Sequence, residues 1–171
     1  GQNVGACRLD RLGQGIRACS LLGLACSAAG LCAMLAFAPQ CAMLFLDSSE
    51  LDAALLVELT SRYIVIQSFF FFPLSLVNIV RFSIQGMGFG PFAILAGVLE
   101  MAARTGVALL LVPAFGYTAA CFASPAAWVC ADLFLIPASA LCIARLRRLY
   151  PNQPEELPET RPVPLKAGAH R

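Results

Sequence analysis

Charged side chains inside apolar segments are the residues of this sequence that could do chemistry. Glu100 and Arg104 interrupt the apolar residues 90–112, and Asp132 interrupts the apolar residues 114–144. On a helix, residues four positions apart project from one face, so Glu100 and Arg104 can form an ion pair. Ionic groups deep in a membrane are costly and are expected to face the protein interior. The pair can therefore line a transport pathway, or it can lock its helix to neighbouring helices.

Asp132 has no basic residue within one helical turn on either side. We expect its carboxyl group to be neutral, exposed to a water-filled cavity, or paired with a distant cation such as Arg104 or a substrate. The structural alternative is a protonated carboxyl that donates to a backbone carbonyl or bonds to Asn78. Gln67 and Asn78 are themselves expected to make interhelical hydrogen bonds.

The composition places these residues in a membrane protein. Of the 171 residues, 59% are hydrophobic and 13% are charged, far from the values of a soluble domain. The long uncharged runs are continuous rather than alternating, and each has roughly the 20 residues that a helix needs to cross a bilayer. The sequence predicts an all-α integral membrane protein with about four transmembrane helices. These are expected at residues 16–38, 61–82, 91–112 and 118–144.

Prolines are expected to shape these spans. Pro39 should close the first span and Pro113 the third, while Pro73 should kink the second. Pro125 and Pro137 are expected to bend the fourth. The first span also carries small residues at helical spacing, which either permit close approach of a neighbouring helix or reflect the general composition of membrane helices. These are Cys19, Gly23, Ser27 and Gly30.

The connectors carry the charges that orient the protein. Residues 47–58 hold four acids and no base, and are expected to form a short interfacial helix capped by Asp47 or Ser48. Arg62 is the one base on that side. Seven bases lie on the alternate connectors, so the positive-inside rule predicts that both ends are cytoplasmic in the plasma (inner) membrane. They are Arg8, Arg11, Arg17, Arg81, Arg145, Arg147 and Arg148. Residues 149–171 are predicted to be a disordered cytoplasmic tail.

Enzyme and metal-site patterns are not found in the sequence. The eight cysteines form no CxxC pair and no Cys/His cluster, so they are expected to be small apolar residues of helices rather than metal ligands. No nucleophile elbow, zinc pattern or Walker loop occurs, which argues against an enzyme and against ATP-driven transport. No cofactor is expected.

Four short motifs resemble one family of transporters. GQNVGACRLDR, RFSIQGMGFGP, GVLEMAARTG and FGYTAACFASPAAW occur in the order and spacing of the last four helices of multidrug and toxic compound extrusion (MATE) transporters. The resemblance covers residues 1–148. It implies a twelve-helix exporter of two lobes, in which this chain is a partial C-terminal lobe and the N-terminal lobe is missing. The best-established coupling carboxylate of the family lies in that missing lobe, so the resemblance assigns no coupling site here.

The resemblance further implies a cation-coupled antiporter that uses Na⁺ or H⁺ to expel organic cations and drugs by alternating access. The expected partners are the lipid bilayer, small organic cations and the missing lobe, with no nucleic acid. Two alternatives stay open, a non-transporting membrane scaffold subunit and a flippase or exporter of polysaccharide or lipid precursors. As a fragment, the chain is not expected to transport alone. The candidate pathway residues are Gln67, Asn78, Glu100, Arg104 and Asp132.

Overall fold

The computed structural model describes residues 1–6, 8–45 and 52–150, and within these ranges the chain forms helices and no strand. A short helix α1 (Gln2–Gly5) precedes the long α2 (Asp10–Met43), and a bent pair follows, α3 (Ala53–Phe69) and α4 (Phe71–Gly86). The third rod consists of α5 (Gly90–Gly106), the π-helical η1 (Val107–Leu111) and α6 (Val112–Phe115), and the fourth of α7 (Tyr117–Cys121) and α8 (Ala123–Leu149). The predicted cap at Asp47 or Ser48 lies outside the described residues, as does the predicted tail 149–171 apart from Leu149, which ends α8, and Tyr150.

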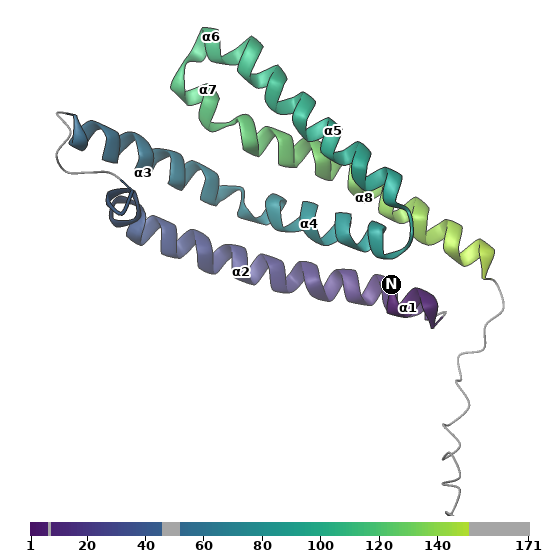
Figure 1. The fold of residues 1–171 in the computed structure, drawn as a ribbon. Helices are drawn as coiled ribbons and strands as arrows, with labels where there is room; N and C mark the ends of the chain where they lie inside the picture. The colour runs from purple at the N-terminus through teal and green to yellow at the C-terminus, as the bar shows by residue number, and fades with distance from the viewer. Residues whose placement is uncertain (7, 46–51, 151–171) are drawn as a thin grey trace, which may run out of the picture.

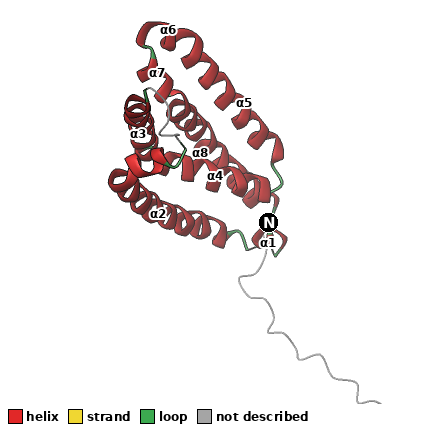
Figure 2. Ribbon diagram, turned by 60° about the vertical axis from the view of Figure 1, so that its left-hand side comes forward, coloured by secondary structure: helices red, strands yellow, loops and turns green. Residues whose placement is uncertain are grey.

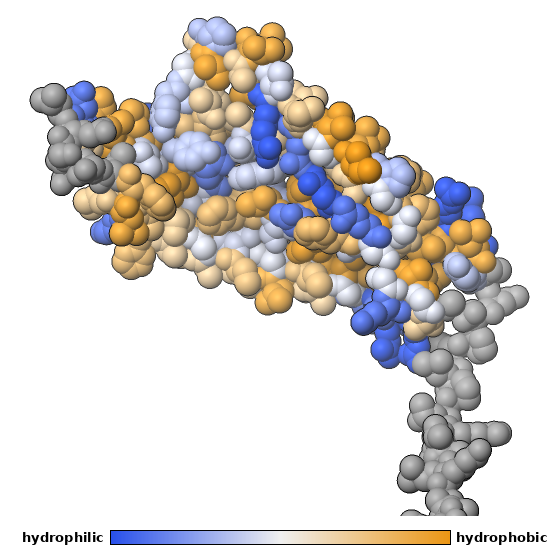
Figure 3. All heavy atoms as spheres, in the orientation of Figure 1, coloured by the Kyte–Doolittle hydropathy of each residue, from blue (hydrophilic) through white to orange (hydrophobic). Residues whose placement is uncertain are grey.

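Four antiparallel rods run between two ends of the molecule (Figure 1). Three helical segments among the described residues are long and apolar enough to cross a membrane, namely α2, the rod from α5 to α6, and α8. The pair α3–α4, bent by 51°, makes a fourth if it is counted as one span. Large apolar side chains are exposed along these rods, and orange dominates much of the visible surface (Figure 3). The predicted all-α membrane fold is confirmed.

The core lies where α4, α5, α8 and the start of α2 meet (Figure 2). Small residues of α8, such as Ala131 and Ala138, let α8 pack closely along α4 and α5. Ile84 of α4 and Leu135 of α8 are fully buried at the centre of this cluster. Apolar packing thus fixes α4, α5 and α8 relative to one another. At the other end of the bundle, the Tyr117 hydroxyl links α7 to α3 by donating to the Leu59 carbonyl at 2.6 Å.

The small residues of α2 mark its contact with α4. A Cβ atom added to Gly23 would collide with the side chain of Ser75, and one added to Gly30 would lie 3.1 Å from the ring of Phe71. Both neighbours belong to α4. Two glycines of the predicted stripe therefore serve close helix approach, as small residues of membrane helices commonly do.

Two prolines that were expected to end spans lie inside helices. Pro39 is within α2, which continues to Met43, because Ala38 and Ala42 are buried and hold the last turn in place. Pro113 lies in the first turn of α6, directly after the π turn of η1. A π turn shifts the backbone bonding by one residue, which accommodates the missing amide of a proline. Pro137 lies within α8, which is continuous through it. The predicted helix ends at Pro39 and Pro113 were wrong.

Candidate functional site

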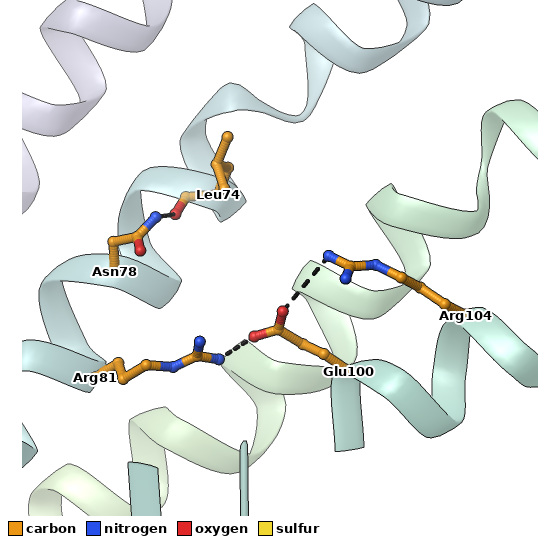
Figure 4. A network of polar contacts seen from close by, with 5 residues as sticks. All are labelled: Leu74, Asn78, Arg81, Glu100 and Arg104. Atoms are coloured by element: carbon orange, nitrogen blue, oxygen red, sulfur yellow. Dashed lines mark hydrogen bonds and ion pairs between the residues drawn. The ribbon is translucent and has the colours of Figure 1, made fainter. Parts of the chain in front are cut away.

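An ionic cluster joins α4 to α5. Glu100 of α5 is buried, with 12% of its side chain exposed, and each of its carboxylate oxygens faces a different arginine. Oε1 accepts from Nη2 of Arg81 on α4, and Oε2 lies 3.5 Å from Nη2 of Arg104, one turn further along α5 (Figure 4). The predicted Glu100–Arg104 pair is confirmed. Because the carboxylate is shared, these three side chains carry one net positive charge.

The ion pair between Arg81 and Glu100 was not predicted from the sequence. Arg81 lies near the end of a span and was therefore assigned to the connector between two spans. Arg81 lies five residues before the end of α4, and Glu100 lies ten residues after the start of α5. The axial offset is about 7.5 Å at the helical rise of roughly 1.5 Å per residue, a step that an arginine side chain can cover. The connector between α4 and α5 is only three residues long, residues 87–89. A short connector of this kind is the sequence signal that could have revealed the pair.

The ionic cluster lies on a polar face of the bundle. Hydrophilic side chains gather between α4 and α5 on the face shown in Figure 3. The Arg104 side chain is 46% exposed there, and Asn78 of α4 is also exposed. Asn78 donates to the carbonyl of Leu74 in its own helix at 2.9 Å, so the predicted interhelical hydrogen bond was wrong (Figure 4). We call Asn78, Arg81, Glu100 and Arg104 the α4–α5 polar face.

Asp132 lies on α8, which packs against both α4 and α5. It is 8% exposed, and its Oδ1 atom is buried with no hydrogen-bond partner among the described residues. Within the described ranges, Asp132 pairs with neither Arg104 nor Asn78. A buried carboxyl oxygen without a hydrogen-bond partner is costly in free energy, which makes Asp132 a candidate functional residue.

Gln67 lies apart from the polar face, at a point where two helical rods break side by side. α3 gives way to α4 at Phe70, and α7 gives way to α8 at Phe122. Each break lies three residues before a proline, Pro73 or Pro125, as expected when the proline ring clashes with the preceding turn. The rings of Phe70 and Phe122 meet edge to face, with their centroids 6.1 Å apart.

Gln67 satisfies a carbonyl that Pro125 leaves free. In a continuous helix the amide of residue 125 would donate to the carbonyl of Cys121, but proline has no amide hydrogen. Gln67 Nε2 donates to that carbonyl at 2.9 Å, and both residues are buried. The predicted interhelical hydrogen bond of Gln67 is thus confirmed. It holds the two breaks together rather than contributing to the polar face.

Gln67→Ala should lower the free energy of unfolding by about 1–2 kcal/mol, because the Cys121 carbonyl loses its donor in a buried position. The same substitution should cost less than half as much in a Pro125→Ala background, since an alanine at that position supplies the missing backbone amide. Denaturation of the wild type and the single and double variants in mixed detergent micelles measures this coupling. Equal costs in both backgrounds would show that Pro125 is not the reason for the Gln67 contact.

Comparison with known proteins adds one finding to this geometry. A family model described as MatE matches residues 1–101, which covers α1 to α4 and most of α5, including Arg81 and Glu100. No curated protein and no solved structure was found to match the chain. The family model covers more than half of the 171 residues. The chain, a multi-pass helical membrane protein with a polar face between α4 and α5, belongs to the MatE family of transporters.

Proposed function

We propose that the α4–α5 polar face lines the central cavity of a cation-coupled antiporter, which exports organic cations in exchange for Na⁺ or H⁺. The chain would form part of the C-terminal lobe and work with an N-terminal lobe. Membership of the MatE family supports transport in general. The observation that carries the proposal is the partial exposure of Arg104, at 46%, within a membrane span.

A charged side chain of this kind cannot face acyl chains without a large cost in free energy. The side chains of Arg104 and Asn78 are both exposed on the α4–α5 polar face, whereas the exposed residues elsewhere on the rods are mostly apolar. This face must therefore meet water or another part of the protein. A water-filled cavity between two lobes near the middle of the membrane is the usual place for the binding site of a secondary transporter.

Asp132 is the residue we expect to exchange ion for substrate. Glu100 is neutralised by Arg81 and Arg104, which leaves Asp132 as the carboxyl group without a hydrogen-bond partner at Oδ1 among the described residues. When Asp132 is ionised, it can attract an organic cation, Na⁺ or H⁺, and only one of these at a time. Mutually exclusive binding at one carboxylate is sufficient to couple export of the organic cation to import of the ion.

Ethidium efflux from cells that express the complete gene tests this function. We expect lower ethidium accumulation than in empty-vector cells. We also expect this difference to disappear when one of the two gradients, of sodium or of protons, is collapsed. The gradient whose collapse has this effect identifies the coupling ion. Accumulation equal to that of empty-vector cells, with the protein present in the membrane, would contradict drug export and favour a scaffold or a flippase of larger precursors.

The predicted orientation, with both ends cytoplasmic, forms part of this proposal. The antiparallel arrangement brings the start of α2, the end of α4 and the end of α8 to one end of the bundle (Figure 1). Six of the seven arginines lie in those segments, and Arg8 lies just before α2. At the opposite end, Asp52 lies just before α3, and Glu58 and Arg62 lie in its first half. The asymmetry supports a cytoplasmic location for the arginine-rich end in a plasma membrane.

A further inference from the structure

A pocket of about 420 Å³ lies at the arginine-rich end of the bundle, away from the α4–α5 polar face. It is formed by the start of α5 and the last turns of α8. Its apolar wall includes Phe89, Phe92 and Leu141, and its charged rim consists of Arg145 and Arg148. Leu141 lies one turn deeper along α8 than Arg145, about 6 Å at the helical rise. The pocket thus runs from the end of a span towards the hydrocarbon layer.

The two arginines are held in a geometry suited to an anion. Residues three positions apart share one face of a helix, so Arg145 and Arg148 both project over the pocket. The guanidinium carbon of Arg145 lies 5.8 Å from the centroid of the Phe89 ring. A guanidinium over an aromatic ring keeps its edge N–H groups free to donate to a phosphate. Within the described residues, no acidic side chain forms a salt bridge with either arginine.

The start of α5 adds to the positive potential of the pocket. α5 begins at Gly90 with no side-chain cap and no acidic residue in its first turn. The dipole of α5 favours a nearby anion, while Pro91 supplies no amide and the Phe92 amide donates to the Phe89 carbonyl. The apolar wall is fixed from behind, because the ring of Phe92 packs against Phe134 of α8, with their centroids 6.4 Å apart. The wall and the charged rim are therefore parts of one ordered site.

The geometry points to a binding site for an acidic phospholipid, in which Arg145 and Arg148 bind the headgroup phosphate and one acyl chain lies along Phe89, Phe92 and Leu141. An organic cation is disfavoured by the two arginines. A free phosphate or nucleotide would leave the apolar wall without a ligand. A zwitterionic lipid carries a cationic group that would lie beside two guanidinium groups. An anionic amphiphile fits both halves of the pocket, and basic pockets near span ends commonly bind such lipids.

Native mass spectrometry of the purified full chain in detergent tests the site. We expect phosphatidylglycerol to bind at least tenfold more tightly than phosphatidylcholine with the same acyl chains. Arg145→Gln/Arg148→Gln should weaken phosphatidylglycerol binding by roughly 10- to 30-fold, because each arginine near a charged headgroup contributes about a fivefold gain in affinity. Phe92→Ala should weaken it less, by reducing the apolar wall alone.

The matched control is Arg8→Gln/Arg147→Gln, which removes the same charge from the same end without touching the pocket. Circular dichroism and gel filtration verify that both double variants stay folded. Equal loss of binding in the two double variants would overturn the site in favour of general attraction to a basic surface. Displacement of the lipid by excess inorganic phosphate alone would overturn the role of the acyl chain, and equal affinity for the two lipids would overturn the role of the arginines.

Discussion

Glu100→Gln is expected to be the most damaging single substitution in the span region, because it leaves Arg81 and Arg104 facing each other without a counter-charge. The Arg81 side chain is 21% exposed, and its Nε atom is buried without a hydrogen-bond partner among the described residues. Breaking a buried ion pair by removing one partner costs about 3–5 kcal/mol. We expect a cost of about 3 kcal/mol here, since both arginines keep some exposure. The yield of monodisperse protein and the midpoint of unfolding in mixed micelles measure it.

Two further variants separate pairing from the loss of a carboxylate. Arg104→Gln should cost less than about 1 kcal/mol, because Arg104 is 46% exposed and lies 3.5 Å from its partner. Arg81→Gln/Glu100→Gln should be more stable than Glu100→Gln alone, since replacing both partners leaves no uncompensated ion at that contact. A Glu100→Gln variant as stable as the wild type, or a double variant less stable than Glu100→Gln, would show that the cluster does not link α4 to α5.

The stability and transport effects of this cluster are separable in the complete transporter. If Glu100 mainly locks α4 to α5, export per folded molecule should be close to that of the wild type when folding is rescued at low temperature. If Glu100 shapes the cavity, export per folded molecule should fall as well. The shared carboxylate and the short connector between the two helices favour the locking role. The partial exposure of Arg104 shows that the same cluster also borders the polar face.

The apolar helices long enough to span a membrane could be predicted from the sequence, because their signal is the absence of charge over long runs, a property that needs no tertiary context. The ends of the helices could not. Pro39 removes one backbone bond, yet α2 continues to Met43 with Ala38 and Ala42 buried on either side of the proline. Pro113 is accommodated by a π turn at residues 107–111, and the sequence of those residues carries no pattern that predicts a π turn. Packing and backbone adjustment, rather than propensity, decided both cases.

The candidate site was predictable in its residue types and less so in its contacts. The Glu100–Arg104 pair follows from helical spacing, and an interhelical bond from Gln67 follows from the cost of an unpaired amide in a membrane. The Arg81 contact depends on how two helices meet across a three-residue connector. Asn78 turned back to its own backbone because it lies on the exposed polar face, where no neighbouring helix offers a partner among the described residues. Tertiary geometry was needed for both.

Asp132→Asn should abolish the ion dependence of export in the complete transporter while leaving the fold intact. Asparagine has nearly the shape of a protonated aspartic acid, so it mimics the neutral state at a position that is 8% exposed. The ionic cluster of Arg81, Glu100 and Arg104 on α4 and α5 is not altered by this substitution. Stability should therefore equal or exceed that of the wild type, because burial of an ionised carboxylate is no longer required.

The measurement is ethidium efflux from cells at several external pH values, with and without a sodium gradient. We expect at least a tenfold loss of export and a flat pH profile for Asp132→Asn, since the variant can neither release a proton nor attract a cation. Asp52→Asn is the matched control, because it makes the same chemical change at an exposed residue before α3 and should export normally. Export by Asp132→Asn that equals the wild type at every pH would remove this carboxyl group from the transport mechanism, and the coupling site would then have to lie elsewhere in the transporter.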